Sequence, residues 1–239
     1  VQVFLNDKSV DYIFSINYLF IIGKQILGHP EKYCINFHGS LLPKYRGRTP
    51  HVWAIINGEE ETGITAHIMD EGCDTGPIIK QIVIPIEYWD TGGSLLDKFT
   101  DKYPELLDNV ITELQKNNLR IQEQDHQKAT YFGKRNPEDG EINWNWQKER
   151  IRNWIRAQAY PYPGAFSYLN GQKIIIDKIT YSDLGYTYDQ PNGKILKVNK
   201  KPFVKTPNGL VILEKIRHNP SYFTENKQFD LKSDHNEYS

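Results

Sequence analysis

The chain has 239 residues, a length that suits one large domain or one domain with a small appendage. Hydrophobic residues make up 38% and aromatic residues 13%, which excludes wholesale disorder, and the formal net charge of −1 argues against a broad nucleic-acid-binding surface. With two cysteines, no signal-peptide pattern and no apolar run near the roughly 20 residues that span a bilayer, the sequence predicts a cytoplasmic protein without a disulfide framework or a membrane segment.

The first predicted strand covers residues 11–16, where aromatic and branched residues are concentrated almost at the start of the chain. A short helix is expected around residues 23–27. An apolar segment lies between these two elements, and its pattern alone favours burial in the protein core. The side chains concerned are Phe20, Ile21 and Ile22.

A second strand is predicted at residues 33–38, because aromatic and branched residues crowd a short run that ends at Gly39. Side chains alternate between the two faces of a strand, so Asn36, His38 and Ser40 point to one side. The turn at Gly39 then leaves the amide and the imidazole at the carboxyl end of the strand. Ligands of open parallel sheets bind at that edge, which makes Asn36 and His38 candidate site residues.

Three residues that can carry positive charge follow, namely Arg46, Arg48 and His51, before a helix expected at residues 52–56. Guanidinium groups match the oxygens of phosphate, so this cluster suits a diphosphate. Two other roles are equally compatible with the sequence. Arg46 can anchor the loop, and Arg48 can be a solvated surface residue.

A third strand, predicted at residues 64–69, leads into the loop 70–76. Gly72 and Gly76 allow this loop to curl tightly and to aim the carboxylate of Asp74. An amide, a neutral imidazole and a carboxylate together suit acyl transfer without a protein nucleophile. The amide and the imidazole can donate to a developing oxyanion while the carboxylate manages protons.

His67 lies on the strand that precedes this loop. A lone histidine on an apolar strand is more often a packed core residue than a ligand, and that is the expectation here. The sequence also predicts no metal centre, because the cysteine and histidine residues lack the spacing of a closed site. The residues considered were Cys34, Cys73, His38 and His67.

The rest of the first domain is predicted to be scaffold. A strand is expected at residues 77–84, and a helix at residues 95–114, where apolar residues recur at helical spacing and Pro104 can introduce a kink. From residue 122 to residue 139 the chain turns polar, which predicts the boundary of the domain.

A helix at residues 149–159 follows, and then the period changes to that of short strands. Asn170 and Gly171 suit a type I′ hairpin turn. The strands between residues 165 and 216 predict a small β subdomain. The polar residues 217–239 are expected to be a loose tail or a helix that needs a partner. The predicted domains are therefore 1–130, 131–216 and 217–239.

The β subdomain is also predicted to pair two copies of the chain. Its short strands are expected to leave unpaired edges, and a small sheet cannot bury all of its apolar side chains alone. The apolar residues expected on that surface are Tyr186, Tyr188, Phe203 and Val211.

Three motifs together resemble the folate-dependent formyltransferases. They are Asn36-x-His38, the run Ser-Leu-Leu-Pro-x-Tyr-Arg-Gly over residues 40–47, and Asp74-Thr-Gly, with Asp74 lying 38 residues after Asn36. The resemblance implies an α/β fold in which a Rossmann-like formyltransferase domain with a mostly parallel sheet precedes a small β-rich C-terminal subdomain. Members of that family carry roughly two further strand–helix units before the first strand seen here, so we expect the numbering to begin inside a longer protein.

The resemblance also implies roles for particular residues. Asn36, His38 and Asp74 would be catalytic: His38 donates to the formyl oxygen, Asn36 holds that oxygen, and Asp74 takes a proton from the attacking amine. N10-formyltetrahydrofolate would be the co-substrate, with no metal. Its implied contacts are Phe20, Ile21, Ile22, Met69, Asp70 and Glu71, and the implied substrate contacts are Ser40, Arg46 and Arg48.

Residues 130–144 and 160–168 resemble the amino-sugar branch of the family. This branch implies a dTDP- or UDP-linked amino sugar as the partner, and dTDP-4-amino-4,6-dideoxyglucose is the expected substrate, used for surface polysaccharides such as the lipopolysaccharide O-antigen. Several members pair through the C-terminal region, which also points to a homodimer.

Three other functions share parts of this pattern. A methionyl-tRNA formyltransferase would have the same catalytic set but should carry a basic C-terminal domain, which the net charge of −1 disfavours. A glycinamide ribonucleotide formyltransferase would usually end near residue 120. A binding module without enzymatic activity would be expected to lose Asn36, His38 or Asp74, and none of them is lost.

Overall fold

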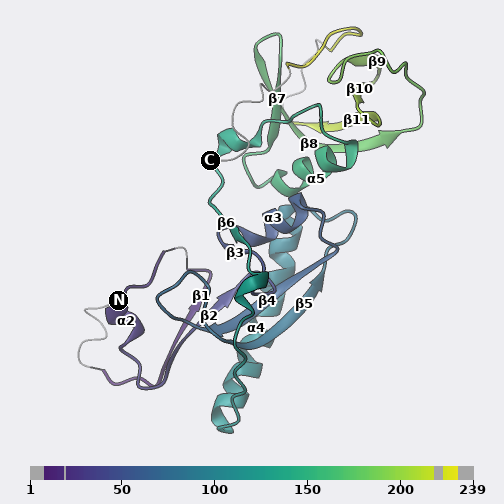
Figure 1. The fold of residues 1–239 in the computed structure, drawn as a ribbon. Helices are drawn as coiled ribbons and strands as arrows, with labels where there is room; N and C mark the ends of the chain where they lie inside the picture. The colour runs from purple at the N-terminus through teal and green to yellow at the C-terminus, as the bar shows by residue number, and fades with distance from the viewer. Residues whose placement is uncertain (1–7, 19, 218–222, 231–239) are drawn as a thin grey trace. The chain divides into compact units, whose positions relative to one another are not determined.

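The computed structural model describes residues 8–18, 20–217 and 223–230. The chain divides into two compact units. Unit 1 contains the residues up to 134 except for the segments 55–58 and 89–93, and unit 2 contains those two segments and the residues from 135 onward. The ribbon of each unit can be followed in Figure 1.

Unit 1 is built on a four-stranded sheet in the order β1-β2-β4-β5. The α/β class is confirmed, although mostly parallel pairing was expected and the described sheet is mixed: β1 and β2 pair in parallel, while β2–β4 and β4–β5 are antiparallel. A loop without a helical crossover joins β4 to β5, and such a connection permits only antiparallel pairing. The strands are β1 (Tyr12–Ile16), β2 (Tyr33–His38), β4 (Glu61–Ile68) and β5 (Ile78–Pro85).

The long helix α4 (Gly92–Gln115) supplies much of the core of unit 1, as its helical spacing predicted. Its buried side chains include Leu95, Phe99, Leu106 and Val110. Phe99 lies directly against the turn after β2, where a Cβ atom on Gly39 would come within 3.0 Å of the ring. The shorter helices are α2 (Lys24–Leu27) and α3 (Pro50–Ile56).

A network around Thr65 fastens the loop that follows β2. The hydroxyl of Thr65 donates to the carbonyl of Ser40 (2.6 Å) and accepts from the amide of Leu42 (3.2 Å) and from Nε2 of Gln81 (2.8 Å). The loop ends in the short strand β3 (Arg46–Gly47), which pairs in parallel with β6 (Tyr131–Phe132). The loop is therefore held at both of its ends.

Unit 2 contains a five-stranded antiparallel sheet in the order β7-β8-β11-β10-β9. Asn170 and Gly171 join the first two strands with φ angles of 53° and 73°, as a type I′ turn requires. The elements are α5 (Lys148–Gln158), β7 (Ala165–Leu169), β8 (Gln172–Ser182), β9 (Ile195–Asn199), β10 (Lys201–Thr206) and β11 (Gly209–Ile216).

The outer strands of this sheet are not left unpaired, contrary to expectation. In β7 the carbonyl of Phe166 accepts from the amide of Ile142 (2.7 Å). In β9 the amide of Ile195 donates to Lys227 and its carbonyl accepts from Asn226, both at 2.8 Å. Segments from outside the strands thus cover both edges, which a count of short strands cannot reveal.

The packing of unit 2 differs from two further expectations. Val211, predicted to offer apolar surface, is fully buried because its strand β11 lies in the middle of the sheet. The described part of the polar tail packs on the sheet: Phe229 is buried and stacks on Trp144 with ring centroids 5.0 Å apart. Residues 218–222 and 231–239 of that tail lie outside the described residues.

His51 makes the stability of the fold depend on pH. The imidazole is buried edge-on against Phe99, and burial lowers its pKa to about 4. The unfolded chain takes up this proton near pH 6.5, so the free energy of unfolding should fall as the pH drops from 6.5 towards 4, by up to about 1.4 kcal/mol per pH unit. Urea unfolding at several pH values should give a shallower dependence for His51→Gln.

His29→Gln is the matched control, because His29 is only half-buried. It should keep the pH dependence of the wild type. A slope for His51→Gln equal to that of the wild type would show that His51 is protonated in the folded chain.

Candidate active site

Polar side chains occupy facing positions on β2 and β4. In the antiparallel register Asn36 pairs with His67, and His38 pairs with Thr65. Alternate residues share a face, so all four side chains lie on the same face of the sheet. His38, His67 and Thr65 are buried, and Asn36 is partly exposed. The predicted amide and imidazole therefore lie side by side, with a second imidazole opposite.

The loop after β4 brings Asp74 to this group. Its Oδ1 atom lies 3.5 Å from Nδ1 of His38, 3.5 Å from Nδ2 of Asn36 and 3.7 Å from Nε2 of His67. Its Oδ2 atom accepts a hydrogen bond from the amide of Gly47 (2.9 Å). The structure thus brings Asn36 and His38 together at the carboxylate of Asp74.

Short-range contacts shape this loop. The carboxylate of Asp70 accepts from the hydroxyl of Thr75 (2.6 Å) and from the amide of Gly72 (3.0 Å). At Gly76 a Cβ atom would lie 1.9 Å from the last carbonyl of β4, so only glycine fits. Asp74 itself adopts a φ of 55°, in the left-handed region that aspartate tolerates better than most residues.

Asp74 is ionised under ordinary conditions. Burial alone raises the pKa of its carboxyl group, but the neighbouring His67, the charge of His38 and the Gly47 amide outweigh burial and hold the pKa well below its usual range. An Asp74 carboxylate is therefore a weak base. It is better suited to orienting and stabilising a cation beside it than to keeping a proton.

The hydrogen bonds of His38 decide which of its nitrogens faces Asp74. Nε2 lies 2.8 Å from the carbonyl of Tyr45, and because a carbonyl only accepts, Nε2 carries the proton. Burial lowers the pKa of His38, although Asp74 and the Tyr45 carbonyl oppose that effect. In the neutral ring Nδ1 then presents a lone pair to the site, and it becomes a donor only after taking up a proton.

His67 is part of the site, although the sequence predicted an ordinary core residue. Its Nδ1 donates to the carbonyl of Ile68 (3.0 Å), so Nε2 accepts from Nδ2 of Asn36 (3.2 Å). This bond fixes the orientation of the Asn36 amide, and it leaves the carbonyl oxygen of Asn36 to meet a ligand. Only the strand register reveals the pairing of His67 with Asn36; the one signal in the sequence is a polar residue on an apolar strand.

The two segments with implied folate contacts lie close together. Lys24, directly after residues 20–22, forms an ion pair of 2.7 Å with Glu71 in the Asp74 loop. The core expectation was wrong for Phe20 and Ile21, whose exposed fractions are 72% and 95%. Two large apolar side chains open to solvent beside the loop suit the flat ring of a ligand better than a core.

Two residues with implied substrate contacts are engaged within the protein. Ser40 is fully buried and donates its hydroxyl to the carbonyl of Lys44 (2.6 Å). Arg46 is also buried, and its guanidinium donates to Gln124, Tyr131 and His126. These contacts give both residues a role in holding the loop.

Arg48 and His51 complete the predicted cationic cluster. Arg48 is half-buried, and its backbone amide donates to the carbonyl of Phe132 (2.9 Å). His51 is neutral near pH 7, because burial lowers its pKa to about 4. A role for Arg48 in anion binding stays a prediction.

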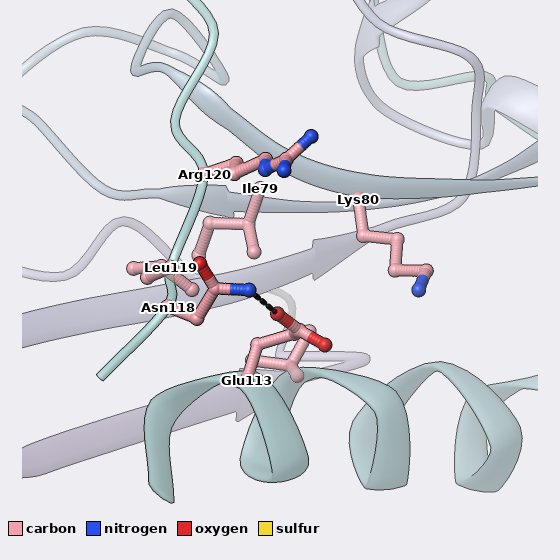
Figure 2. Close-up of a pocket in the computed structure, with 7 residues that line it drawn as sticks. Ile79, Lys80, Glu113, Asn118, Leu119 and Arg120 are labelled. Carbon is pink, nitrogen blue, oxygen red and sulfur yellow. Dashed lines mark hydrogen bonds between the residues drawn. The ribbon is translucent and has the colours of Figure 1, made fainter. Parts of the chain in front are cut away.

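Two hollows of unit 1 are lined by other residues. One of about 360 Å³ lies between β5, α4 and residues 118–120, where Asn118 donates to Glu113 (3.2 Å), as Figure 2 shows. Another of about 460 Å³ is lined by β1 and α4. None of the predicted site residues lines either hollow.

Across the described ranges, no group of three histidine, cysteine or acidic residues is arranged to hold a metal ion. In the same residues, no helix has the length and hydropathy to cross a membrane.

Comparisons with known proteins match most of the chain to one family. Residues 1–111 match the family model described as formyl transferase, and residues 134–225 match the model of the formyl transferase C-terminal domain.

Several solved structures are similar to the chain. An N-formyltransferase from Helicobacter canadensis, in complex with folinic acid and dTDP-3-aminofucose, is 25% identical with a TM-score of 0.69, covering 84% of this chain and 72% of that one. WlaRD, a sugar 3N-formyl transferase solved with dTDP and 5-N-formyl-THF, is 25% identical with a TM-score of 0.69, covering 88% and 76%. Methionyl-tRNA formyltransferase from Clostridium thermocellum is 27% identical with a TM-score of 0.60, covering 72% and 73%.

Proposed function

Because the chain belongs to the formyl transferase family, we propose that it transfers a formyl group from N10-formyltetrahydrofolate to the primary amine of a nucleotide-linked amino sugar. The observation that carries the proposal is the meeting of Asn36 and His38 with Asp74 at one carboxylate. The similar structures solved with folates and dTDP compounds support the choice of both substrates.

The contacts of the site suggest how the reaction proceeds. The nitrogen of the amine attacks the formyl carbon, a new C–N bond forms, and negative charge grows on the formyl oxygen. The amine must lose one proton, and N10 of the folate must gain one as its bond to the formyl carbon breaks. Nδ1 of His38 is the atom able to hold that proton, because Asp74 remains ionised beside it and stabilises the imidazolium.

Protonated His38 then has a donor facing the site. A well-placed donor to a developing oxyanion typically lowers the barrier by about 3–4 kcal/mol. The NH2 group of Asn36 already donates to His67 and to Asp74, so the carbonyl oxygen of Asn36 is the group left to orient the attacking amine. Asn36 would therefore act on the nucleophile, rather than only on the formyl oxygen as the family resemblance implies.

The folate would lie between the two segments that the Lys24–Glu71 ion pair joins. The implied contacts are the apolar residues 20–22 on one side, of which Phe20 and Ile21 are exposed, and Met69, Asp70 and Glu71 on the other. Asp70 already accepts two hydrogen bonds within its loop, so its share in folate binding would be to hold the loop in shape.

The proposed sugar is dTDP-4-amino-4,6-dideoxyglucose, used in the cytoplasm for surface polysaccharide such as O-antigen, and a UDP-linked amino sugar is the nearest variant. This choice is supported by the resemblance of residues 130–144 and 160–168 to the amino-sugar branch. The thiols Cys34 and Cys73 are both free, which suits a reducing compartment.

Methionyl-tRNA formyltransferase is the second candidate, favoured by the 27% identity to the enzyme from Clostridium thermocellum. The net charge of −1 disfavours a tRNA substrate. An assay with formyl-folate and a panel of acceptors separates the candidates: dTDP- and UDP-linked amino sugars, glycinamide ribonucleotide and methionyl-tRNA. Transfer to methionyl-tRNA alone would contradict the proposed function.

Replacement of His38 by alanine, or of Asp74 by asparagine, should abolish formyl transfer and leave the fold intact. Each change removes a group that holds or stabilises the transferred proton. The measurement is kcat/KM with circular dichroism as the check on folding, and His29→Ala is the matched control. A variant that kept a tenth of the wild-type kcat/KM, about 1.4 kcal/mol of lost stabilisation, would show that its residue has a different role.

Arg48 should contribute to binding the diphosphate of the sugar nucleotide. We expect Arg48→Ala to raise the KM for the sugar nucleotide several-fold more than the KM for the folate, because the folate carries no diphosphate. Arg120, exposed at the hollow in Figure 2, provides the control Arg120→Ala, which should change neither KM. Equal changes in the two KM values for Arg48→Ala would assign Arg48 to the loop instead.

We also propose that the chain forms a homodimer through the β subdomain. Its sheet edges are covered, so the proposed contact is the loop after β8, where Leu184 is exposed and Tyr188 has an exposed fraction of 90%. Light scattering of the full chain should give a dimer mass at micromolar concentration. Tyr188→Glu should shift it to the monomer, whereas Tyr160→Glu, at another exposed tyrosine, should not. A monomeric wild type would contradict the proposal.

A further inference from the structure

The side chain of Gln124 is buried behind the Asp74 loop, and all of its hydrogen-bonding capacity is used there. Its Nε2 donates to the carbonyl of Asp74 (3.0 Å) and to the carbonyl of Gly76 (2.6 Å). Its Oε1 accepts from Nη2 (2.6 Å) and Nε (3.2 Å) of Arg46. Two donors and two acceptor sites are the full complement of an amide, so the group is held in a single orientation.

Arg46 extends this connection to the other side of the carboxylate. The next residue, Gly47, donates its amide to Oδ2 of Asp74. Gln124 thus joins the loop that carries Asp74 to the strand that supplies its hydrogen-bond donor. Among the described residues, no carboxylate is a hydrogen-bond partner of Arg46. The amide oxygen of Gln124, which can only accept, therefore takes that place beside the guanidinium.

The backbone near Gln124 is itself fixed to the end of this loop. Gln122 and Ile78 exchange two backbone hydrogen bonds of 2.8 Å, and Ile78 is the first residue of β5. The position of Gln124 therefore follows from the sheet. Asp74 has a φ of 55°, a conformation that needs support from tertiary contacts. The side-chain amide of Gln124 gives this support by binding the Asp74 carbonyl.

We propose that Gln124 is a positioning residue for the transfer reaction, which holds the Asp74 carboxylate against Nδ1 of His38 without touching the substrates. Neither the residue type of Gln124 nor the spacing of the motifs indicates this role, because Gln124 lies in the polar stretch that predicts a domain boundary. Its effect on turnover rests on the proposed function, whereas its effect on the geometry of Asp74 and His38 does not.

The variants Gln124→Met and Gln124→Glu separate the contacts. Met removes both donors and the acceptor at similar length, while Glu keeps an acceptor for Arg46 and loses both donors to the loop. Both should lower kcat ten- to a hundredfold, because a misplaced supporting group of this kind typically costs that much, and the KM for formyl-folate should change less than threefold. Gln122→Met and Gln122→Glu, at an exposed side chain two residues away, are the matched controls and should stay within twofold of the wild type.

A second readout needs no substrate. Asp74 raises the pKa of His38, while His67 and Arg46 lower it, so a carboxylate that moves away should make His38 titrate at lower pH in Gln124→Met, which adds no charge beside Arg46. Imidazole resonances followed by NMR measure this shift. In the wild type, both Nε2 protons of Gln124 should also exchange slowly with water, since each is bonded to a carbonyl.

The outcomes separate the two proposals. A folded Gln124 variant with kcat within twofold of the wild type, or a KM that rises as far as kcat falls, would overturn the positioning role. An unchanged His38 titration in a folded variant would also overturn it, and fast exchange of the Nε2 protons in the wild type would overturn it even if no variant folded. If the wild type moves no formyl group to any acceptor, while the Gln124 variant still shows the His38 shift, only the proposed function is refuted.

Discussion

The active-site end of unit 1 is organised around one half-buried carboxylate that groups from three strands reach. Asp74 meets two side chains of β2, one side chain of β4 and a backbone amide of β3, and the contacts from β2 and β3 come from parts of the chain far away in sequence. A buried charge is costly unless it is paired and hydrogen-bonded. The ends of the strands must therefore stay in register for Asp74 to remain ionised, and the same requirement builds the site.

The hydrogen bonds around this carboxylate also give the two imidazoles different roles. His38 is bonded to the Tyr45 carbonyl through Nε2, whereas His67 is bonded to the Ile68 carbonyl through Nδ1. The two rings consequently present different nitrogens to Asp74, Nδ1 from His38 and Nε2 from His67. Backbone carbonyls thus decide which imidazole can exchange a proton with a ligand and which one only holds Asn36 in place.

Much of this arrangement was predictable because it follows local rules. Strand alternation placed Asn36 and His38 on one face, and the glycines around Asp74 indicated a tight loop. Helical spacing predicted α4, and Asn170-Gly171 predicted the first hairpin of unit 2. What escaped prediction depends on pairing between distant segments. His67 acquires its role from the register with Asn36, and Gln124 from the bridge between Gln122 and Ile78. The exposure of Phe20 and the burial of Val211 likewise depend on what lies across from them, which apolar character alone does not reveal.

The covered edges of the C-terminal sheet have a consequence for how the chain behaves when it is cut. Residues 225–228 lie along β9 and occupy backbone groups that would otherwise face solvent. An open edge of this kind is a template for strands from other molecules. Proteolytic loss of the residues from 225 onward would therefore do more than shorten the chain, because it would expose the edge of β9 to strands of other molecules. Residues 225–228 therefore protect the edge of β9 from pairing with other molecules.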